Sequence, residues 1–344
     1  MELKLFSKYS LLCETGKYFT YYHKGFLLVA LTKSPNVIIY KKRIAPVFPS
    51  CSTFLSRLLR LNPRAAINLD EKTILFSSNG KIYKYDIELN EISVEHSFDK
   101  GMNNPLSFCK GPNCILYGEY IWNESKGPVS IFSRINGTWI KVYSFPNNSI
   151  THIHNILYND IDNCYYILTG DADSESGIWK ADLSFSLVEP IIVGSQQYRS
   201  CCACIIGDEL FYATDTPIED NYFYSVKSKN KSVKISKLPG SVIYGRVINN
   251  HFYFSTTVEP DSTISKWRYR FTRKLGSGIA DRYSHIFVFS KEKGITEICK
   301  LEKDFMPMWL FQFGNVLFPS TTDEKIYLVP QSIKHKHGKT YIFE

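Results

Sequence analysis

Residues 164–169 read Cys-Tyr-Tyr-Ile-Leu-Thr, an apolar and aromatic run that ends in a small polar residue. Runs of this kind recur along the chain, at residues 73–77, 114–118, 164–169, 209–214, 251–256 and 315–319. Their starts differ by 41, 50, 45, 42 and 64 residues, and an insertion stretches the last interval. Aromatic and β-branched residues suit a pleated, half-buried strand, so each run is predicted to be the second β-strand of a repeated unit.

Further strands accompany these runs. Third strands are predicted at residues 81–86, 129–134, 177–182, 222–227, 285–290 and 325–330, and fourth strands follow a short turn, as at 139–145 and 295–301. An earlier copy at residues 25–31 and 37–41 brings the number of units to seven. Four short strands that repeat every 40 to 50 residues or so are typical of propeller blades, whereas a β-sandwich does not repeat in this way. The only helix-like stretch, residues 50–61, is predicted to be a short connector.

We therefore predict an all-β protein, a single β-propeller domain over residues 1–344. Seven blades are expected, and six are the alternative because the two ends of the chain are the least regular.

Two turns between predicted third and fourth strands resemble the Asp-box, S-x-D-x-G-x-T-W, of sialidase-like (BNR-repeat) β-propellers. They stand here as Ser133-Arg134-Ile135-Asn136-Gly137-Thr138-Trp139 and as Ala181-Asp182-Leu183-Ser184-Phe185. The first is one residue short and has Asn in place of Asp, and the second keeps Asp and an aromatic residue. The resemblance covers two blades of seven. Because such boxes are structural turns, the resemblance implies a fold and not an activity.

Charge and composition bound the partners. The net charge of +8, from 41 basic and 33 acidic residues, favours anionic partners mildly. No aromatic-rich RNA-binding signature or basic helix accompanies it, so we expect no nucleic-acid partner. The longest apolar run, residues 26–31, is far shorter than a membrane span, which needs about 20 residues. Nine cysteines without framework spacing favour a reducing compartment and a cytoplasmic protein. The oligomeric state stays open.

Propeller topology predicts a site at one mouth of the central channel. The first strand of each blade begins at the mouth to which the loop between the second and third strands also belongs, so polar side chains at these places should converge. Convergent polar groups in a concave mouth are the default site hypothesis. The candidate catalytic residues are His152, His154, Tyr198, Glu119 and Asp171, and the candidate substrate-binding residues in the same ring are Arg199, Arg246, Asp215 and Glu259.

Each of these candidates has a structural alternative. His152 and His154, two residues apart on a strand, point to the same side and could share a ligand, hold a metal or act as a base, or else bond to loop carbonyls. Arg199 and Arg246 could bind a carboxylate or a sulfate, or form salt bridges to Asp171 or Asp215 in the neighbouring blades. The run 201–204, Cys-Cys-Ala-Cys, has the wrong spacing for a closed zinc site and is expected to be structural. We assign no metal ligand and expect no cofactor.

An insertion at about residues 261–281 carries basic and aromatic residues in alternation, Lys-Trp-Arg-Tyr-Arg-Phe-Thr-Arg-Lys at 266–274. A period of two predicts a hairpin arm with one aromatic and one cationic face. Trp267 and Arg268 are the candidate substrate-binding residues on this arm, because aromatic faces stack on sugars and guanidinium groups meet acidic groups. Glycines at 276 and 278 would let the arm hinge as a lid; a solvated loop or an oligomer contact is the alternative.

The expected function is that of a carbohydrate-active enzyme acting on an acidic glycan, as a lyase or a glycoside hydrolase. In a polyuronate lyase, Arg199 or Arg246 would neutralise the uronate. His152, His154 or Tyr198 would then handle protons.

A hydrolase would instead use two carboxylates, such as those of Glu119 and Asp171. The resemblance to sialidases would imply three arginines around a carboxylate, and only two are placed. The alternative function is that of a non-catalytic propeller that binds a glycan or a protein in surface-polysaccharide biosynthesis.

Overall fold

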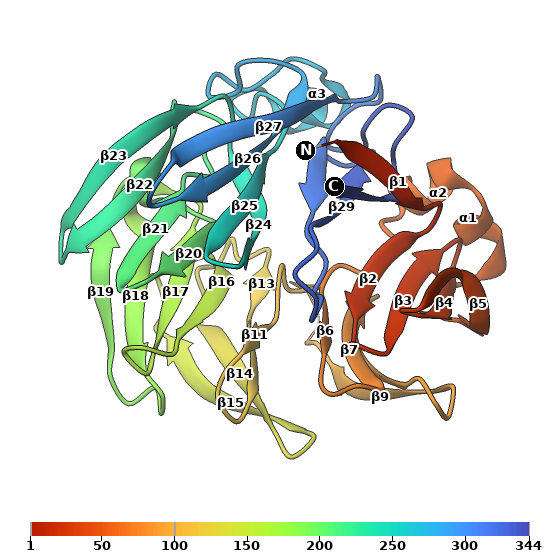
Figure 1. The fold of residues 1–344 in the computed structure, drawn as a ribbon. Helices are drawn as coiled ribbons and strands as arrows, with labels where there is room; N and C mark the ends of the chain where they lie inside the picture. The colour runs from red at the N-terminus through yellow and green to blue at the C-terminus, as the bar shows by residue number, and fades with distance from the viewer. Residues whose placement is uncertain (1, 100, 344) are drawn as a thin grey trace.

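The computed structural model describes residues 2–99 and 101–343. Seven four-stranded antiparallel sheets, the blades, stand around one axis (Figure 1). Blade 1 consists of β2 (Ser10–Glu14), β3 (Tyr18–His23), β4 (Phe26–Leu31) and β5 (Ser34–Arg43), and blade 2 of β6 (Ala66–Asn68), β7 (Thr73–Ser78), β8 (Lys81–Asp86) and β9 (Glu91–Ser97). Blade 3 consists of β11 (Cys109–Lys110), β12 (Ile115–Gly118), β14 (Val129–Ile135) and β15 (Thr138–Phe145), and blade 4 of β16 (His152–Asn159), β17 (Cys164–Gly170), β18 (Gly177–Asp182) and β19 (Val188–Val193).

The remaining blades follow the same pattern. Blade 5 consists of β20 (Cys202–Ile206), β21 (Glu209–Ala213), β22 (Asn221–Ser228) and β23 (Lys231–Leu238), and blade 6 of β24 (Val242–Ile248), β25 (His251–Thr256), β26 (Tyr283–Ser290) and β27 (Gly294–Glu302). Blade 7 consists of β28 (Asn315–Leu317), β29 (Tyr327–Gln331), β30 (Thr340–Phe343) and β1 (Leu3–Ser7). The predicted all-β propeller with seven blades is confirmed.

Short elements join or decorate the blades. They are α1 (Val47–Cys51) and α2 (Thr53–Leu58) between blades 1 and 2, a two-stranded ribbon of β10 (Met102–Asn103) and β13 (Tyr120–Ile121), α3 (Lys266–Phe271) in blade 6, and two single turns, η1 (Asp173–Glu175) and η2 (Gln196–Tyr198). No helix among the described residues has the length and apolar character needed to cross a membrane.

The strand alignment made from the sequence is right in the middle of the chain and one strand out of register at its ends. Residues 315–319 overlap β28, which is the innermost strand of blade 7 and not its second strand, and residues 325–330 overlap the second strand, β29. Residues 25–31 and 37–41 fall on the third and fourth strands of blade 1. The reason is that β1, from the start of the chain, supplies the outermost strand of the last blade. The repeat counted along the sequence therefore does not begin and end where the blades do.

This borrowed strand closes the ring. β1 pairs antiparallel with β30 from Leu3 opposite Phe343 to Ser7 opposite Thr340, so the first and last strands lie side by side (Figure 1). The ring of Phe6 then lies 5.3 Å from that of Phe19 in blade 1 and 5.0 Å from that of Tyr327 in blade 7, both in edge-to-face geometry. Phe6 therefore joins the last blade to the first.

Phe6→Ala should lower the free energy of unfolding by about 2 to 3 kcal/mol, because it removes a partly buried ring and both aromatic contacts across the closure. Leu5→Ala is the matched control on the same strand: Leu5 is 57% exposed, so the change should stay within about 0.5 kcal/mol. Urea titration of the three proteins measures both effects. Equal effects of the two substitutions would contradict this view of the closure.

Candidate active site

The histidines lie at the start of the innermost strand of blade 4. The register of β16 against β17 shifts between Ile153 and Asn155, so His154 sits at a β-bulge, a feature that re-aims a side chain. The opposite residue on β17 must be small, because a Cβ built on Gly170 would lie 2.7 Å from His154 Cε1. The bulge and the glycine together let both imidazoles turn toward the channel axis.

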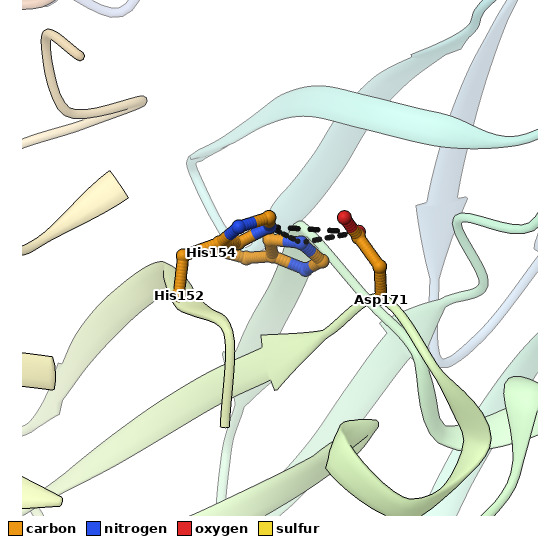
Figure 2. Close-up of side chains that lie close together, drawn as sticks. All are labelled: His152, His154 and Asp171. Atoms are coloured by element: carbon orange, nitrogen blue, oxygen red, sulfur yellow. Dashed lines mark hydrogen bonds and ion pairs between the residues drawn. The ribbon is translucent and has the colours of Figure 1, made fainter. Parts of the chain in front are cut away.

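His152, His154 and Asp171 form one cluster (Figure 2). The two Nε2 atoms are 2.9 Å apart, and Asp171 Oδ1 lies 3.5 Å from Nε2 of His152 and 3.4 Å from Nε2 of His154. The histidine side chains are 6% and 1% exposed, whereas that of Asp171 is 46% exposed. The cluster is therefore buried on the histidine side and reachable from solvent on the carboxylate side.

Neighbouring blades hold the other edge of each imidazole. His152 Nδ1 lies 3.3 Å from the carbonyl oxygen of Ile121 in blade 3, and His154 Nδ1 lies 3.0 Å from that of Ser200, which precedes β20 of blade 5. The bonds to loop carbonyls that were considered as the structural alternative are thus present, and they coexist with the cluster. Burial lowers the pKa of His152, and the charge of Asp171 opposes this.

Arg199 joins blades 4 and 5 at this place. Its Nη2 atom lies 3.0 Å from Asp171 Oδ1 and 3.5 Å from Asp215 Oδ2. Desolvation works against ionisation of Asp171, but the charge of Arg199 holds the pKa of its carboxyl well below the usual range. Cys201 Sγ donates to Asp215 Oδ2 at 3.1 Å. One guanidinium therefore serves two carboxylates, as the salt-bridge alternative expected.

Glu259 lies nearby in the loop after β25. Burial and the charge of Asp215 raise the pKa of its carboxyl to about 8, and its Oε1 accepts from the hydroxyl of Ser241. Two buried polar atoms of the cluster have no hydrogen-bonding partner among the described residues: Arg199 Nε and Asp215 Oδ1. One donor and one acceptor in the site are thus left without a hydrogen-bonding partner from the chain.

Four further residues line the mouth and were missed by sequence reasoning: Tyr120, Tyr269, Arg60 and Arg64. The ring of Tyr120 is 4.3 Å from that of His152, and the guanidinium of Arg64 is 4.6 Å from the Tyr120 ring. Burial and the charges of Glu259 and Asp171 raise the pKa of Tyr269. Burial and the neighbouring charge of Arg64 lower the pKa of Arg60. Only the Arg-x₃-Arg spacing after the helical connector could have pointed to the pair.

Three predicted site residues lie outside the cluster. Glu119 accepts a hydrogen bond from the backbone N–H of Ser130, at 2.6 Å, within its own blade. Tyr198 ends η2 and packs against the hydrophobic cluster between blades 4 and 5. Arg246 donates to Thr321 Oγ1 at 2.9 Å and to the carbonyl of Pro319 in blade 7. Because β24 begins at Val242, Arg246 lies four residues, or about 13 Å, along the strand from its start.

The insertion differs from the predicted hairpin. Residues 266–271 form the short helix α3, in which the ring of Trp267 meets that of Phe271, one turn away, edge to face with centroids 5.0 Å apart. Trp267 is 68% exposed, and Arg268 is also exposed. The alternating basic and aromatic residues therefore lie around a helix, and only Tyr269 faces inward.

The two glycines of the insertion do not act as a hinge. The N–H of Gly278 donates to the carbonyl of Pro217 at 3.0 Å, and any Cβ at Gly276 or Gly278 would strike the carbonyls of Pro217 or Glu219. The glycines are close-packing positions that dock the base of the insertion on blade 5. At its far end Lys266 Nζ reaches Glu124 Oε1 of blade 3 at 3.2 Å. The insertion thus links blade 6 to blade 3 beside the mouth.

Comparisons with known proteins agree with the fold. No protein-family model and no curated protein matches the sequence. Among solved structures, an oligogalacturonate lyase from Vibrio parahaemolyticus is similar, with a TM-score of 0.59 at 12% identity over 99% of this chain and 90% of that one. An oligogalacturonate lyase in complex with manganese has the same TM-score at 10% identity, over 99% and 90% of the chains. The computationally designed Ika8 protein has a TM-score of 0.54 at 9% identity, over 99% and 98%. At these identities the likeness is one of fold.

The raised pKa of Glu259 gives a signed prediction for stability against pH. The folded state holds the proton up to about pH 8, whereas the unfolded chain loses it near its ordinary value of 4.5, so this group's contribution falls as the pH rises through that window. Glu259→Gln has no proton to lose. Its stability relative to the natural protein should therefore increase across the window, by a few kcal/mol at most.

Denaturant titrations at several pH values between 5 and 8.5 or so measure this difference. Glu302→Gln, at a side chain that is 47% exposed, is the control and should show little dependence on pH. A stability difference for Glu259→Gln that stays constant with pH would contradict a buried, protonated carboxyl group.

Proposed function

We propose that this mouth of the propeller binds an acidic saccharide, with the cluster of His152, His154 and Asp171 as its reactive centre. The observation that carries the proposal is the convergence of two buried imidazoles on one half-exposed carboxylate, with all three nitrogen and oxygen atoms within 3.5 Å of one another. Groups that can accept a proton or hold a cation, buried on one side and reachable from solvent on the other, are characteristic of reactive sites.

A cationic rim supports an anionic substrate. Arg60 and Arg64 influence each other electrostatically, and within the described part of the chain neither forms an ion pair with a carboxylate. Arg199, by contrast, is neutralised by two aspartates. Two guanidinium groups that repel each other and have no carboxylate partner favour a bound anion. In this proposal the substrate carboxylate is bound by Arg60 and Arg64, in place of the pair expected from the sequence, while Tyr120 offers a ring for stacking.

Among reactions on acidic glycans, elimination is favoured over hydrolysis. A hydrolase needs an acid and a carboxylate on opposite sides of the glycosidic bond. The carboxylate of Glu119 accepts a hydrogen bond from the backbone N–H of Ser130, so one member of the carboxylate pair expected from the sequence is already engaged. The similar fold of oligogalacturonate lyases agrees with a lyase acting on a uronate-containing glycan.

A binding role without turnover is the second candidate. It is favoured by one observation: Arg199 forms ion pairs that join blades 4 and 5, which is a structural role. In that case the protein would recognise a glycan or a protein in surface-polysaccharide biosynthesis, and the same rim arginines would be the contact residues.

Incubation with a panel of polyuronates and sialylated glycans tests the enzyme proposal. We expect a uronate polymer to yield unsaturated products, detected by the ultraviolet absorbance of the new conjugated double bond. His154→Ala should slow the reaction by about a hundredfold or more, because it removes a group of the reactive centre. Replacing Arg60 and Arg64 by Gln should raise KM about tenfold or more with a smaller effect on kcat.

His335→Ala, an exposed histidine far along the chain, is the control for loss of an imidazole and should react normally. If a folded sample gives no product across the panel but still binds a polyuronate in a calorimetric titration, the binding role is correct and the lyase proposal is wrong.

A further inference from the structure

The hydrogen bonds of the two histidines fix where their protons are. A backbone carbonyl can only accept, so Nδ1 of His152 must donate to Ile121 and Nδ1 of His154 must donate to Ser200. A neutral imidazole carries one N–H, so in both residues the other nitrogen, Nε2, is left with a lone pair. These two Nε2 atoms are the ones that face each other at 2.9 Å.

The centre of the cluster therefore contains acceptors only. Two Nε2 lone pairs and a carboxylate oxygen point at the same place, with no histidine proton between them. Arg199 Nη2 compensates the carboxylate from one side, at 3.0 Å from Asp171 Oδ1, but the two Nε2 lone pairs still face each other at 2.9 Å, and a positive ion among the three atoms removes this repulsion. Figure 2 shows the three side chains converging in this way. A shared proton or a metal ion could supply the charge.

We propose that His152, His154 and Asp171 hold a divalent transition-metal ion, which deepens the proposed function of the same site. The three atoms form a triangle with sides of 2.9, 3.4 and 3.5 Å, whose circumscribed circle has a radius of about 1.9 Å. Metal–ligand distances to histidine nitrogen and carboxylate oxygen are about 2.0 to 2.2 Å, so an ion slightly out of the plane fits without rearrangement of the chain.

The surroundings are those of a metal site. A ligating histidine usually donates its other N–H to a backbone carbonyl or a carboxylate, which orients the ring, and both histidines do so here. Three protein ligands leave a position open for substrate, and the half-exposed side of Asp171 provides access. Two imidazoles and one carboxylate select transition metals such as Zn²⁺ or Mn²⁺, whereas Ca²⁺ and Mg²⁺ prefer sets composed of oxygen atoms.

A second set of residues, His154, Cys201 and Asp215, also brings ligand-type atoms together, within 4.8 Å of one another. Cys201 Sγ already donates its proton to Asp215 Oδ2 at 3.1 Å, so this thiol is not free to act as a ligand. The first set is therefore the one that needs a cation. An ion bound there would place a positive charge next to the carboxylate of an acidic sugar, while the two histidines would serve as ligands.

The test measures metal binding without any saccharide. The full chain is stripped with a chelator, and Zn²⁺, Mn²⁺, Co²⁺ and, as a negative control, Ca²⁺ are titrated by calorimetry and by elemental analysis after dialysis. We expect one transition-metal ion per chain, a rise in the unfolding temperature with Zn²⁺ or Co²⁺, and visible absorption bands of bound Co²⁺ that report its nitrogen ligands.

Asp171→Asn should weaken the binding of Co²⁺ at least tenfold. His154→Ala, which removes its ligand completely, should weaken it about a hundredfold. Asp171→Asn keeps the shape of the side chain, so it remains informative if His154→Ala fails to fold. His335→Ala should bind normally, which excludes the histidine-containing turn at 335–337 as the binding place.

A stripped protein that takes up none of the transition metals, or one whose affinity is unchanged in Asp171→Asn, would overturn the proposal in favour of a shared proton. The result does not depend on turnover. If the metal binds but no glycan is processed, the proposed function fails and this inference stands; if glycan is processed by a metal-free chain, the inference alone fails.

Discussion

Each histidine of the cluster is oriented by a backbone carbonyl from a neighbouring blade, and this constraint makes the site depend on the whole ring. His152 is held by Ile121 of blade 3 and His154 by Ser200 ahead of blade 5, while both rings come from blade 4. The imidazoles can converge only when these three blades are packed at their native spacing. The closure of the ring by β1 and β30 maintains that spacing from the opposite side of the molecule.

Electrostatics then divides the mouth into two parts. Around the cluster, Arg199 balances Asp171 and Asp215, and Glu259 stays protonated because it is buried beside other carboxylates. At the rim, Arg60 and Arg64 are not balanced by any carboxylate in the described residues. The interior of the site is thus nearly neutral and the entrance is cationic, an arrangement that attracts an anionic ligand toward a centre built to hold a further positive charge.

Much of this could be predicted from the sequence. The repeat predicted seven blades, and blade topology correctly brought His152, His154, Asp171 and Arg199 to one mouth, because strand starts and second loops converge in any propeller. The errors have physical causes. Arg246 was assigned to the same mouth, but β24 begins four residues before it, at Val242, and a rise of about 3.3 Å per residue carries the arginine about 13 Å along the channel.

The rest depends on contacts that a linear pattern does not contain. Arg60 and Arg64 lie in a connector between blades, where no repeat marks them. The alternation at 266–271 fits a strand by period, but the insertion docks on blade 5 and forms a helix in which Trp267 and Phe271 make an edge-to-face contact one turn apart. Above all, the sequence shows that two histidines are present but not which ring nitrogen of each carries the proton. Only the carbonyl acceptors on the neighbouring blades determine that both Nε2 atoms face inward as bases.

The most direct measurement is therefore the tautomeric state of these two histidines by ¹⁵N nuclear magnetic resonance, with histidine-selective labelling and assignment from single substitutions. The account predicts that Nδ1 carries a proton in both His152 and His154, and that addition of Zn²⁺ shifts the Nε2 resonances of both. A proton found on Nε2 alone in either residue would contradict it, because the cluster would then contain its own donor and would need no added cation.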